Sequence, residues 1–272
     1  MNTKRIYSEN AAYQMFEVLK SNRNKRHKHG VFLVEGVKGI NEALLGGWRF
    51  QSFLHSFEGK LSDWATCLLE GIPTDVNYEL PQALMDRLSD KTDTSELLGI
   101  VYMKEEAAFR HAENPLLVLF DRPSNKGNLG TLLRSCDALG ADRLLLTGHA
   151  VDIYDPEVVR SSMGSFFRVP FARLGANAEI EAYFAALRRE YPGLQLIGAT
   201  AHRQRTISEL DLTGPVLFLL GNEAEGLNRW LAEQCDALAT IPMRADAAAT
   251  SFNVSCAATV LLYEAARQRG FT

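Results

Sequence analysis

Glycines and polar residues gather in three short segments of the second half of the sequence, each after an apolar run of strand length. The first segment holds Asn128, Gly130 and Arg134 at the start of a predicted helix, residues 129–139. Glycines let a ligand approach the backbone, and the free N–H groups of a helix N-terminus can bind an anion. The spacing is not that of a glycine-rich nucleotide motif. Asn128 also suits an N-cap, which is the simpler interpretation when the segment is taken alone.

The second segment, residues 221–227, directly follows the apolar run at residues 216–220. Asn222 with Glu225 three residues later resembles a capping box for a helix predicted at residues 223–235. That interpretation leaves Glu223 and the glycines on both sides without a role.

The third segment starts with Ile241, Pro242 and Met243 and continues, after a link at residues 244–250, into Ser251–Phe252–Asn253. Ser251 or Asn253 would cap the last helix, predicted at residues 253–269. Taken alone, this segment is also better explained by capping than by catalysis.

The elements that position these segments are strands alternating with helices. We predict strands at residues 116–120, 143–147, 194–200, 215–221 and 238–243, and a further helix at residues 178–190 with Asn177 as its N-cap. Such alternation predicts an α/β fold with a parallel sheet covered on both faces. Ligands bind such sheets at the carboxyl ends of the strands, where all three segments lie.

The first half of the chain predicts a separate small α/β domain, with a buried strand at residues 31–34 and a helix at residues 35–45 that ends at two glycines. Residues 105–114 are charged and have little apolar pattern. We therefore predict domains at residues 1–106 and 115–272, joined by a linker at residues 107–114.

A basic segment at residues 20–30 contains five Lys or Arg residues and no acid, although the net charge of the chain is −4. A solvated basic loop and an RNA-binding surface are equally good interpretations of it. The candidate RNA contacts are Arg23, Lys25, Arg26 and Lys28.

Composition excludes several other classes of protein. The four cysteines have no metal-ligand spacing and the six histidines form no cluster, so we expect reduced thiols and no metal site. The start of the sequence has no signal-peptide pattern, and none of its apolar runs could span a bilayer, so we expect a cytoplasmic protein.

In this order, the three segments resemble the signature motifs of the SpoU (TrmH-like) RNA 2′-O-ribose methyltransferases, a family within the SPOUT superfamily. Residues 160–165, which begin with Arg160, also resemble that family, and the likeness covers about residue 115 to the end. Residues 26–36 resemble the ribosomal-protein-like RNA-binding domain that precedes the catalytic domain in many ribosomal RNA enzymes of this family. The resemblance implies a C-terminal trefoil knot, the cofactor S-adenosylmethionine, an RNA substrate, most often ribosomal, and a homodimer formed by the methyltransferase domain.

The resemblance also implies roles for individual residues. Those matching the catalytic motif positions are Arg134, Asn128, Glu223, Ser251 and Asn253. Those matching cofactor-binding positions are Leu220, Gly221, Ile241, Met243 and Phe252. Arg160 joins the candidate RNA contacts.

The chemistry requires activation of a ribose hydroxyl, whereas the sulfonium leaving group needs no metal. The family's arginine, matched here by Arg134, is held to be catalytic, but a guanidinium stays protonated to beyond about pH 12. Arg134 could instead bind the adjacent phosphate and stabilise negative charge on the oxygen, with Asn128 orienting it. Glu223 could orient Arg134, also from a partner subunit, or accept the proton.

Two departures from the family pattern bear on the adenosine pocket. Phe252 stands where relatives have leucine, and the seven-residue link at residues 244–250 is longer than usual. A bulkier ring overpacks a formed pocket, so we expect the longer link to compensate for Phe252.

Three alternatives remain. The first is a transfer-RNA methyltransferase of the same family, although those enzymes typically lack the N-terminal domain. The second is a catalytically inactive RNA-binding protein, which retention of all three motifs argues against. The third is a nucleotide-dependent oxidoreductase, which the missing glycine fingerprint argues against.

Overall fold

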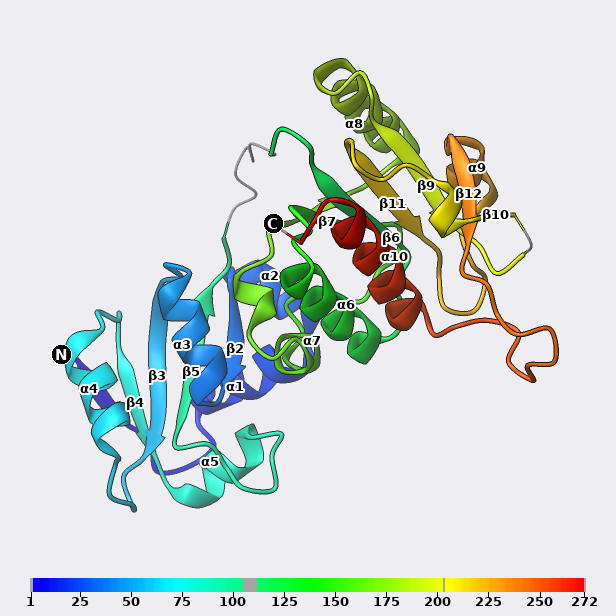
Figure 1. Cartoon of the computed structure of the whole chain (residues 1–272). Coiled ribbons are helices and arrows are strands. Elements are labelled where there is room, and N and C mark those ends of the chain that lie inside the picture. Colours follow the sequence, from blue (N-terminus) through cyan, green and yellow to red (C-terminus); the bar gives the residue numbers. More distant parts are fainter. Residues whose placement is uncertain (1, 105–111, 203, 272) are drawn as a thin grey trace. The chain divides into compact units, whose positions relative to one another are not determined.

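The structure is a computed structural model that describes residues 2–104, 112–202 and 204–271. The chain forms two compact units (Figure 1). The N-terminal unit comprises Met1–Glu105 and Asp152–Arg168, and the C-terminal unit comprises Glu106–Val151 and Val169–Thr272. The segment Asp152–Arg168 therefore belongs to the N-terminal unit. The domain boundaries predicted from sequence remain a prediction, and most of the predicted linker at residues 107–114 lies outside the described residues.

The N-terminal unit contains a mixed five-stranded sheet in the order β1-β4-β3-β5-β2. Its strands are β1 (Thr3–Arg5), β2 (Val31–Glu35), β3 (Phe50–Ser56), β4 (Asn77–Leu80) and β5 (Leu97–Tyr102). Strand β5 is antiparallel to β2 and β3, and the other pairs are parallel. Its helices are α1 (Ala11–Ser21), α2 (Arg23–His29), α3 (Val37–Leu45), α4 (Asp63–Gly71), α5 (Gln82–Leu88), α7 (Pro156–Ser161) and the 3-10 turn η1 (Ser165–Phe167).

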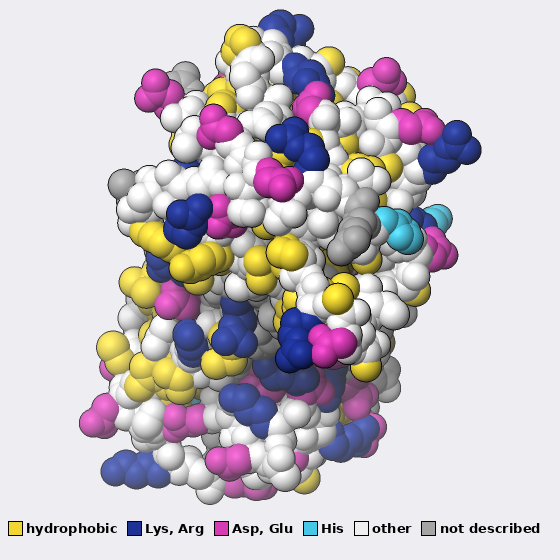
Figure 2. Space-filling model, turned by 45° about the vertical axis from the view of Figure 1, so that its right-hand side comes forward, with side chains coloured by type: hydrophobic (Ala, Val, Ile, Leu, Met, Phe, Trp, Pro, Cys, Tyr) yellow, Lys and Arg dark blue, Asp and Glu magenta, His cyan; other side chains and the backbone are white. Residues whose placement is uncertain are grey.

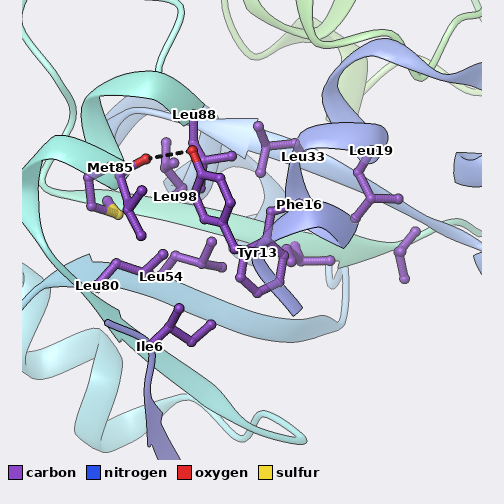
Figure 3. Close-up of a cluster of buried hydrophobic side chains, with 13 residues drawn as sticks. Ile6, Tyr13, Phe16, Leu19, Leu33, Leu54, Leu80, Met85, Leu88 and Leu98 are labelled. Atoms are coloured by element: carbon purple, nitrogen blue, oxygen red, sulfur yellow. Dashed lines mark hydrogen bonds between the residues drawn. The ribbon is translucent and has the colours of Figure 1, made fainter. Parts of the chain in front are cut away.

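Helix α1 supplies one hydrophobic core of this unit (Figure 3). Asn10 begins the helix, since its side chain accepts hydrogen bonds from the N–H groups of residues 12 and 13. Tyr13, Phe16 and Leu19 recur every three residues, so they share one face of the helix and are buried. The Tyr13 hydroxyl donates to the Leu84 carbonyl at 3.3 Å, which satisfies its polar end inside the core.

A second, aromatic core is formed where Asp152–Arg168 packs on the sheet. Phe32 points to the face opposite Leu33, as side chains alternate along a strand. Its ring contacts Tyr154, Phe166 and Phe167. Trp48 joins the cluster and its indole N–H donates to the Phe167 carbonyl at 3.3 Å. Hence Asp152–Arg168 is an integral part of the N-terminal unit.

The basic segment is helical rather than a loop. Asn22 ends α1 and caps α2, which runs from Arg23 to His29 and stops at Gly30 in the left-handed conformation. The loop was one of two interpretations of this segment, because no apolar residue interrupts the run. Its caps at both ends stabilise the helix. The buried Arg26 anchors it to the rest of the unit, as apolar residues usually do.

The C-terminal unit contains a seven-stranded sheet, and all of its strand pairs are parallel. The predicted parallel α/β fold is confirmed. The strands are β6 (Leu116–Asp121), β7 (Arg143–Thr147), β8 (Phe171–Leu174), β9 (Gln195–Ala199), β10 (Arg205–Thr206), β11 (Val216–Leu220) and β12 (Ala237–Thr240), in the order β10-β12-β9-β11-β6-β7-β8. The helices are α6 (Lys126–Ala138), α8 (Asn177–Glu190), α9 (Arg229–Glu233), α10 (Val254–Gln268) and the 3-10 turn η2 (Ile207–Glu209).

Helices cover both faces of this sheet. Alternate residues of β6 and β11, among them Leu117 and Leu217, pack with Ile180 and Phe184 of α8 and with Leu231 of α9. Helices α6 and α10 lie side by side (Figure 1), joined by a hydrogen bond of 2.6 Å between the hydroxyls of Ser135 and Thr259. None of the described helices is long and apolar enough to cross a membrane.

Three helix starts differ from the prediction. Helix α6 begins at Lys126 with Asn125 as its N-cap, so the capping interpretation of Asn128 is wrong. Helix α9 begins only at Arg229, capped by Asn228. Helix α8 already includes Asn177, and no side chain caps it. In contrast, Asn253 caps α10 as predicted.

Candidate active site

The three polar segments leave the sheet at one edge. Strands β6, β11 and β12 are parallel members of the same sheet, separated only by β9 between β11 and β12. The segments follow the carboxyl ends of these strands, so the topology brings them to the edge where such sheets bind ligands.

Glu223 binds the N-terminus of α6. Its carboxylate accepts hydrogen bonds from the N–H and hydroxyl of Ser124 at 3.0 and 2.7 Å, and from the N–H of Asn125 at 3.1 Å. It also accepts one from the Asn128 amide at 3.3 Å. Partial burial raises the pKa of Glu223, but the hydrogen bonds from Ser124 and Asn128 outweigh burial and lower it overall. A carboxylate held in this way stays ionised and is a poor proton acceptor.

Asn128 connects the first segment to the other two. Its amide nitrogen donates to Glu223, and its oxygen accepts from the Asn253 amide at 3.0 Å. The Asn253 oxygen accepts in turn from the N–H and hydroxyl of Ser255, at 3.0 and 2.6 Å. These bonds cap the start of α10. The predicted residues Asn128, Glu223 and Asn253 therefore form one hydrogen-bonded network.

Arg134 lies on α6, six residues beyond Asn128, and its side chain is exposed. Within the described parts of the chain it has no hydrogen-bond or ion-pair partner, so neither Asn128 nor Glu223 orients it. Ser251 is exposed as well. The structure thus assembles a rigid polar network and leaves the guanidinium open.

Residues 221–227 form a tight loop for which Gly221 is required. A Cβ at Gly221 would lie 1.9 Å from the Leu227 nitrogen, so only glycine lets the backbone fold back on itself. Asn222 and Gly226 exchange two backbone hydrogen bonds of 3.0 and 2.9 Å. This loop occupies the residues where the helix at 223–235 was predicted to start. The Asn222 side chain accepts from the Glu225 N–H at 3.1 Å, as in a capping box, but the Glu225 carboxylate pairs with Arg122 and α9 begins only at Arg229.

Arg122 is a site residue that the sequence analysis missed. It adopts a left-handed backbone conformation with φ +49°. Its guanidinium pairs with Glu225 and with Asp121, the latter at 3.0 Å, and its carbonyl accepts from the Asn222 amide at 2.7 Å. The side chain lies across Gly148, where a Cβ would be 2.5 Å from Arg122 Cγ. Arg122 thus fixes the 221–227 loop to the end of β6.

The predicted cofactor residues surround the same sheet edge. Leu220 is buried at the end of β11, Ile241 and Met243 are half-buried after β12, and Phe252 is 44% exposed. Leu227 of the 221–227 loop and Leu238 of β12 both pack against Gly198 of β9, where its Cβ would be. Across the described ranges, no group of His, Cys, Asp and Glu could hold a metal ion.

The candidate RNA contacts have different environments. Arg26 is 1% exposed and pairs with Asp152 at 2.8 Å and Asp155 at 3.3 Å, so its guanidinium is not open to a phosphate. Lys25 and Lys28 are exposed and Arg23 is half-buried. Arg160 is exposed and pairs with Asp90 at 3.2 Å. In Figure 2, Lys and Arg are interspersed with acidic side chains instead of forming one continuous basic surface.

Comparison with known families defines the class of protein. The SpoU rRNA Methylase family matches residues 115–263, and the SpoU L30e-like domain matches residues 10–99. The chain therefore belongs to the SpoU rRNA methylase family and is a methyltransferase. The resemblance seen in the three motifs is confirmed, and so is the class of enzyme that it implied.

Individual relatives are similar to this chain over most of its length. The 23S rRNA (uridine(2479)-2′-O)-methyltransferase of Streptomyces viridochromogenes is 40% identical over 98% of this chain and 93% of its own length. The 23S rRNA (guanosine(2553)-2′-O)-methyltransferase of Bacillus subtilis is 27% identical over 89% of this chain and 90% of its own. The crystal structure of the SpoU methyltransferase AviRb from S. viridochromogenes, in complex with the cofactor AdoMet, superposes with a TM-score of 0.89. It is 39% identical and covers 96% of this chain and 98% of that one.

Proposed function

We propose that this protein transfers a methyl group from S-adenosylmethionine to a ribose 2′-hydroxyl of 23S ribosomal RNA in the cytoplasm. The observation that carries the proposal is the network in which Asn128 joins Glu223 and Asn253, together with an open Arg134 on the helix that carries Asn128. The names of two relatives aligned over most of this chain support 23S RNA as the substrate.

The residues at the sheet edge fit an adenosine-bearing cofactor. Gly221 lets two backbone segments approach closely, and Ile241, Met243 and Phe252 offer apolar side chains that are half-buried or exposed. Such a lining suits an adenine ring, with backbone groups giving specificity. These residues and Leu220 would hold the cofactor, which supplies an activated methyl group on its sulfonium.

The roles of the polar groups follow from their environments. Arg134 has no protein partner among the described residues, so it is available to bind the phosphate beside the target ribose and to stabilise negative charge on the oxygen. Glu223 already accepts four hydrogen bonds and has a lowered pKa, so we assign it to positioning α6 rather than to proton transfer. Asn128 and Asn253 connect Glu223 and α6 to the start of α10 through hydrogen bonds. Ser251 remains a candidate for contact with the ribose.

We also propose the homodimer and the trefoil knot that the resemblance implies. Helix α10 has an exposed apolar surface with Val260 and Tyr263, and Tyr263 packs against exposed Phe271 at 5.4 Å between ring centroids. Exposed apolar residues on one surface favour association with another chain. The knot is supported by the chain path, which leaves central β11 for β12 and returns to α10 beside α6 (Figure 1).

The experiment is methyl transfer from labelled S-adenosylmethionine to unmodified 23S rRNA, followed by mapping of 2′-O-methyl positions. We expect one modified ribose with the wild type and none with Arg134→Ala. Transfer to transfer RNA but not to 23S rRNA would favour the transfer-RNA alternative. Binding of RNA without any transfer or cofactor binding would favour the inactive RNA-binding protein.

A further inference from the structure

The N-terminal unit contains a cavity of about 200 Å³ that the proposed reaction does not use. Three separate segments line it: the end of β2 with the start of α3, the loop after α5, and α7 with the turn that follows. Each segment contributes one cationic side chain, namely Lys38, Lys91 and Arg160.

The acidic side chains that line the cavity already have hydrogen-bond or ion-pair partners. Glu35 accepts hydrogen bonds from the Ser89 hydroxyl at 2.5 Å and from the Asp90 N–H at 3.1 Å. Asp90 pairs with Lys20 at 2.8 Å and with Arg160 at 3.2 Å. By contrast, Lys91 donates only to the Ser95 hydroxyl at 2.8 Å, and Lys38 has no partner in the described part of the chain. Two ammonium groups at the cavity therefore lack a counter-ion.

The backbone adds further donors beside these cations. Gly36 is the N-cap of helix α3, has φ +91° and provides no side-chain cap, so the first N–H groups of the helix are left for a ligand. A Cβ at Gly36 would lie 2.7 Å from Lys91 Nζ, so glycine is what lets this ammonium approach the helix start. Ammonium groups together with helix N–H groups are the donors that bind phosphate.

The cavity also has an apolar wall. Val37 and Met163 are 55% and 50% exposed, and Pro156 and Val159 also line the cavity. A free inorganic anion gains nothing from such a wall, whereas an unstacked nucleotide can lay its base or ribose on it.

We propose that this cavity binds a phosphate group of the substrate RNA together with its unpaired nucleotide. The proposal rests on the proposed function for the identity of the substrate. It names a site for RNA that includes Arg160 but lies apart from α2, because none of the α2 residues lines the cavity. Residues 156–164 complete the site, so a segment between two catalytic motifs takes part in substrate recognition.

The test compares full-length Lys38→Ala, Lys91→Ala and the double variant with Lys60→Ala, an exposed lysine of the same unit outside the cavity. Binding to unmodified 23S rRNA transcripts is measured against salt concentration. We expect the double variant to bind about tenfold more weakly, and each single variant to lower the log–log salt slope by about one. The Michaelis constant for RNA should rise while kcat at saturating RNA stays unchanged.

Equal RNA affinity and salt slope for the double variant and Lys60→Ala would overturn the proposal. Titration with uridine monophosphate tests whether the cavity binds a free mononucleotide instead of a nucleotide of RNA. If the mononucleotide binds more tightly than RNA and the double variant loses that binding, the cavity is a free-nucleotide site and the proposal is wrong. Methyl transfer by the wild type is recorded separately, so failure of the proposed function is distinguished from failure of the RNA site.

Discussion

Helices α2 and α6 each present an arginine from a polar segment, and the two arginines have opposite environments. Arg26 of α2 is buried, pairs with Asp152 and Asp155, and donates to the carbonyls of Leu19 and Lys20 at 2.9 and 3.2 Å. Arg134 of α6 is exposed and has no partner among the described residues. A buried charge must be fully paired to be tolerated, whereas an arginine that binds a substrate must be left open. We therefore assign a structural role to Arg26 and propose a functional one for Arg134.

The largest effect should come from the open arginine. We expect Arg134→Lys to lower kcat about 10²–10³-fold, because lysine keeps the charge but loses the planar fork that can stabilise an oxyanion. Binding of S-adenosylmethionine, measured by calorimetry, should stay unchanged. Arg189→Lys, at an exposed position of α8, serves as the control. A lysine variant with most of its activity would mean that Arg134 acts only as a positive charge.

The buried arginine should affect folding rather than activity. Arg26→Met should lower the free energy of unfolding by about 3–5 kcal/mol, because Asp152 and Asp155 would keep buried charges without their partner. Urea unfolding measures this change. Lys25→Met on the same helix is exposed and should change stability by less than about 0.5 kcal/mol. Similar stabilities for the two variants would show that the ion pairs contribute nothing net.

Glu223 offers a pH-dependent test of the network beside the open arginine. Its pKa is lowered in the folded protein, so the stability it contributes is present above its unfolded pKa and is lost as pH falls through the folded value. Glu223→Gln should therefore cost about 0.3–1 kcal/mol at pH 7, a small value because the side chain is half-exposed. The difference should vanish in acid below the ordinary pKa range of glutamate. Thermal unfolding against pH measures it, with Glu181→Gln on α8 as control, and a difference that persists in acid would contradict this role.

The smallest effect is expected at Phe252. The sequence suggested that its ring overpacks the pocket and that the link at residues 244–250 compensates. In this structure the ring is 44% exposed and the link is exposed throughout, so we expect the two to act independently. We expect Phe252→Leu to change the dissociation constant for S-adenosylmethionine less than about threefold, and a double-mutant cycle with a shortened link to be additive within about 0.5 kcal/mol. A larger coupling energy would restore the original interpretation.

The sequence predicted elements well where one physical signal decided them. Residues 143–147, with consecutive leucines at their centre, are buried and match β7 in full, and Asn253, one of the two predicted candidates, caps α10. The prediction was wrong at the start of α6, where the N-cap was placed at Asn128. The Asn125 side chain caps this helix instead, and the Asn128 amide donates to Glu223 across the chain. Arg122 could not be predicted, since its role depends on a left-handed backbone and on the space over Gly148.

The membership of Asp152–Arg168 in the N-terminal unit has a consequence for dissecting this protein. The chain crosses between the units after Glu105, after Val151 and after Arg168. A protease cut near the first crossing would leave a fragment in which Tyr154 and Phe166 had lost Phe32, and in which Asp152 had lost Arg26. Such a fragment would expose aromatic surface and a charge without its partner, which favours aggregation. The N-terminal unit therefore cannot be exchanged as one continuous stretch of sequence. A chimera between relatives has to transfer both Met1–Glu105 and Asp152–Arg168.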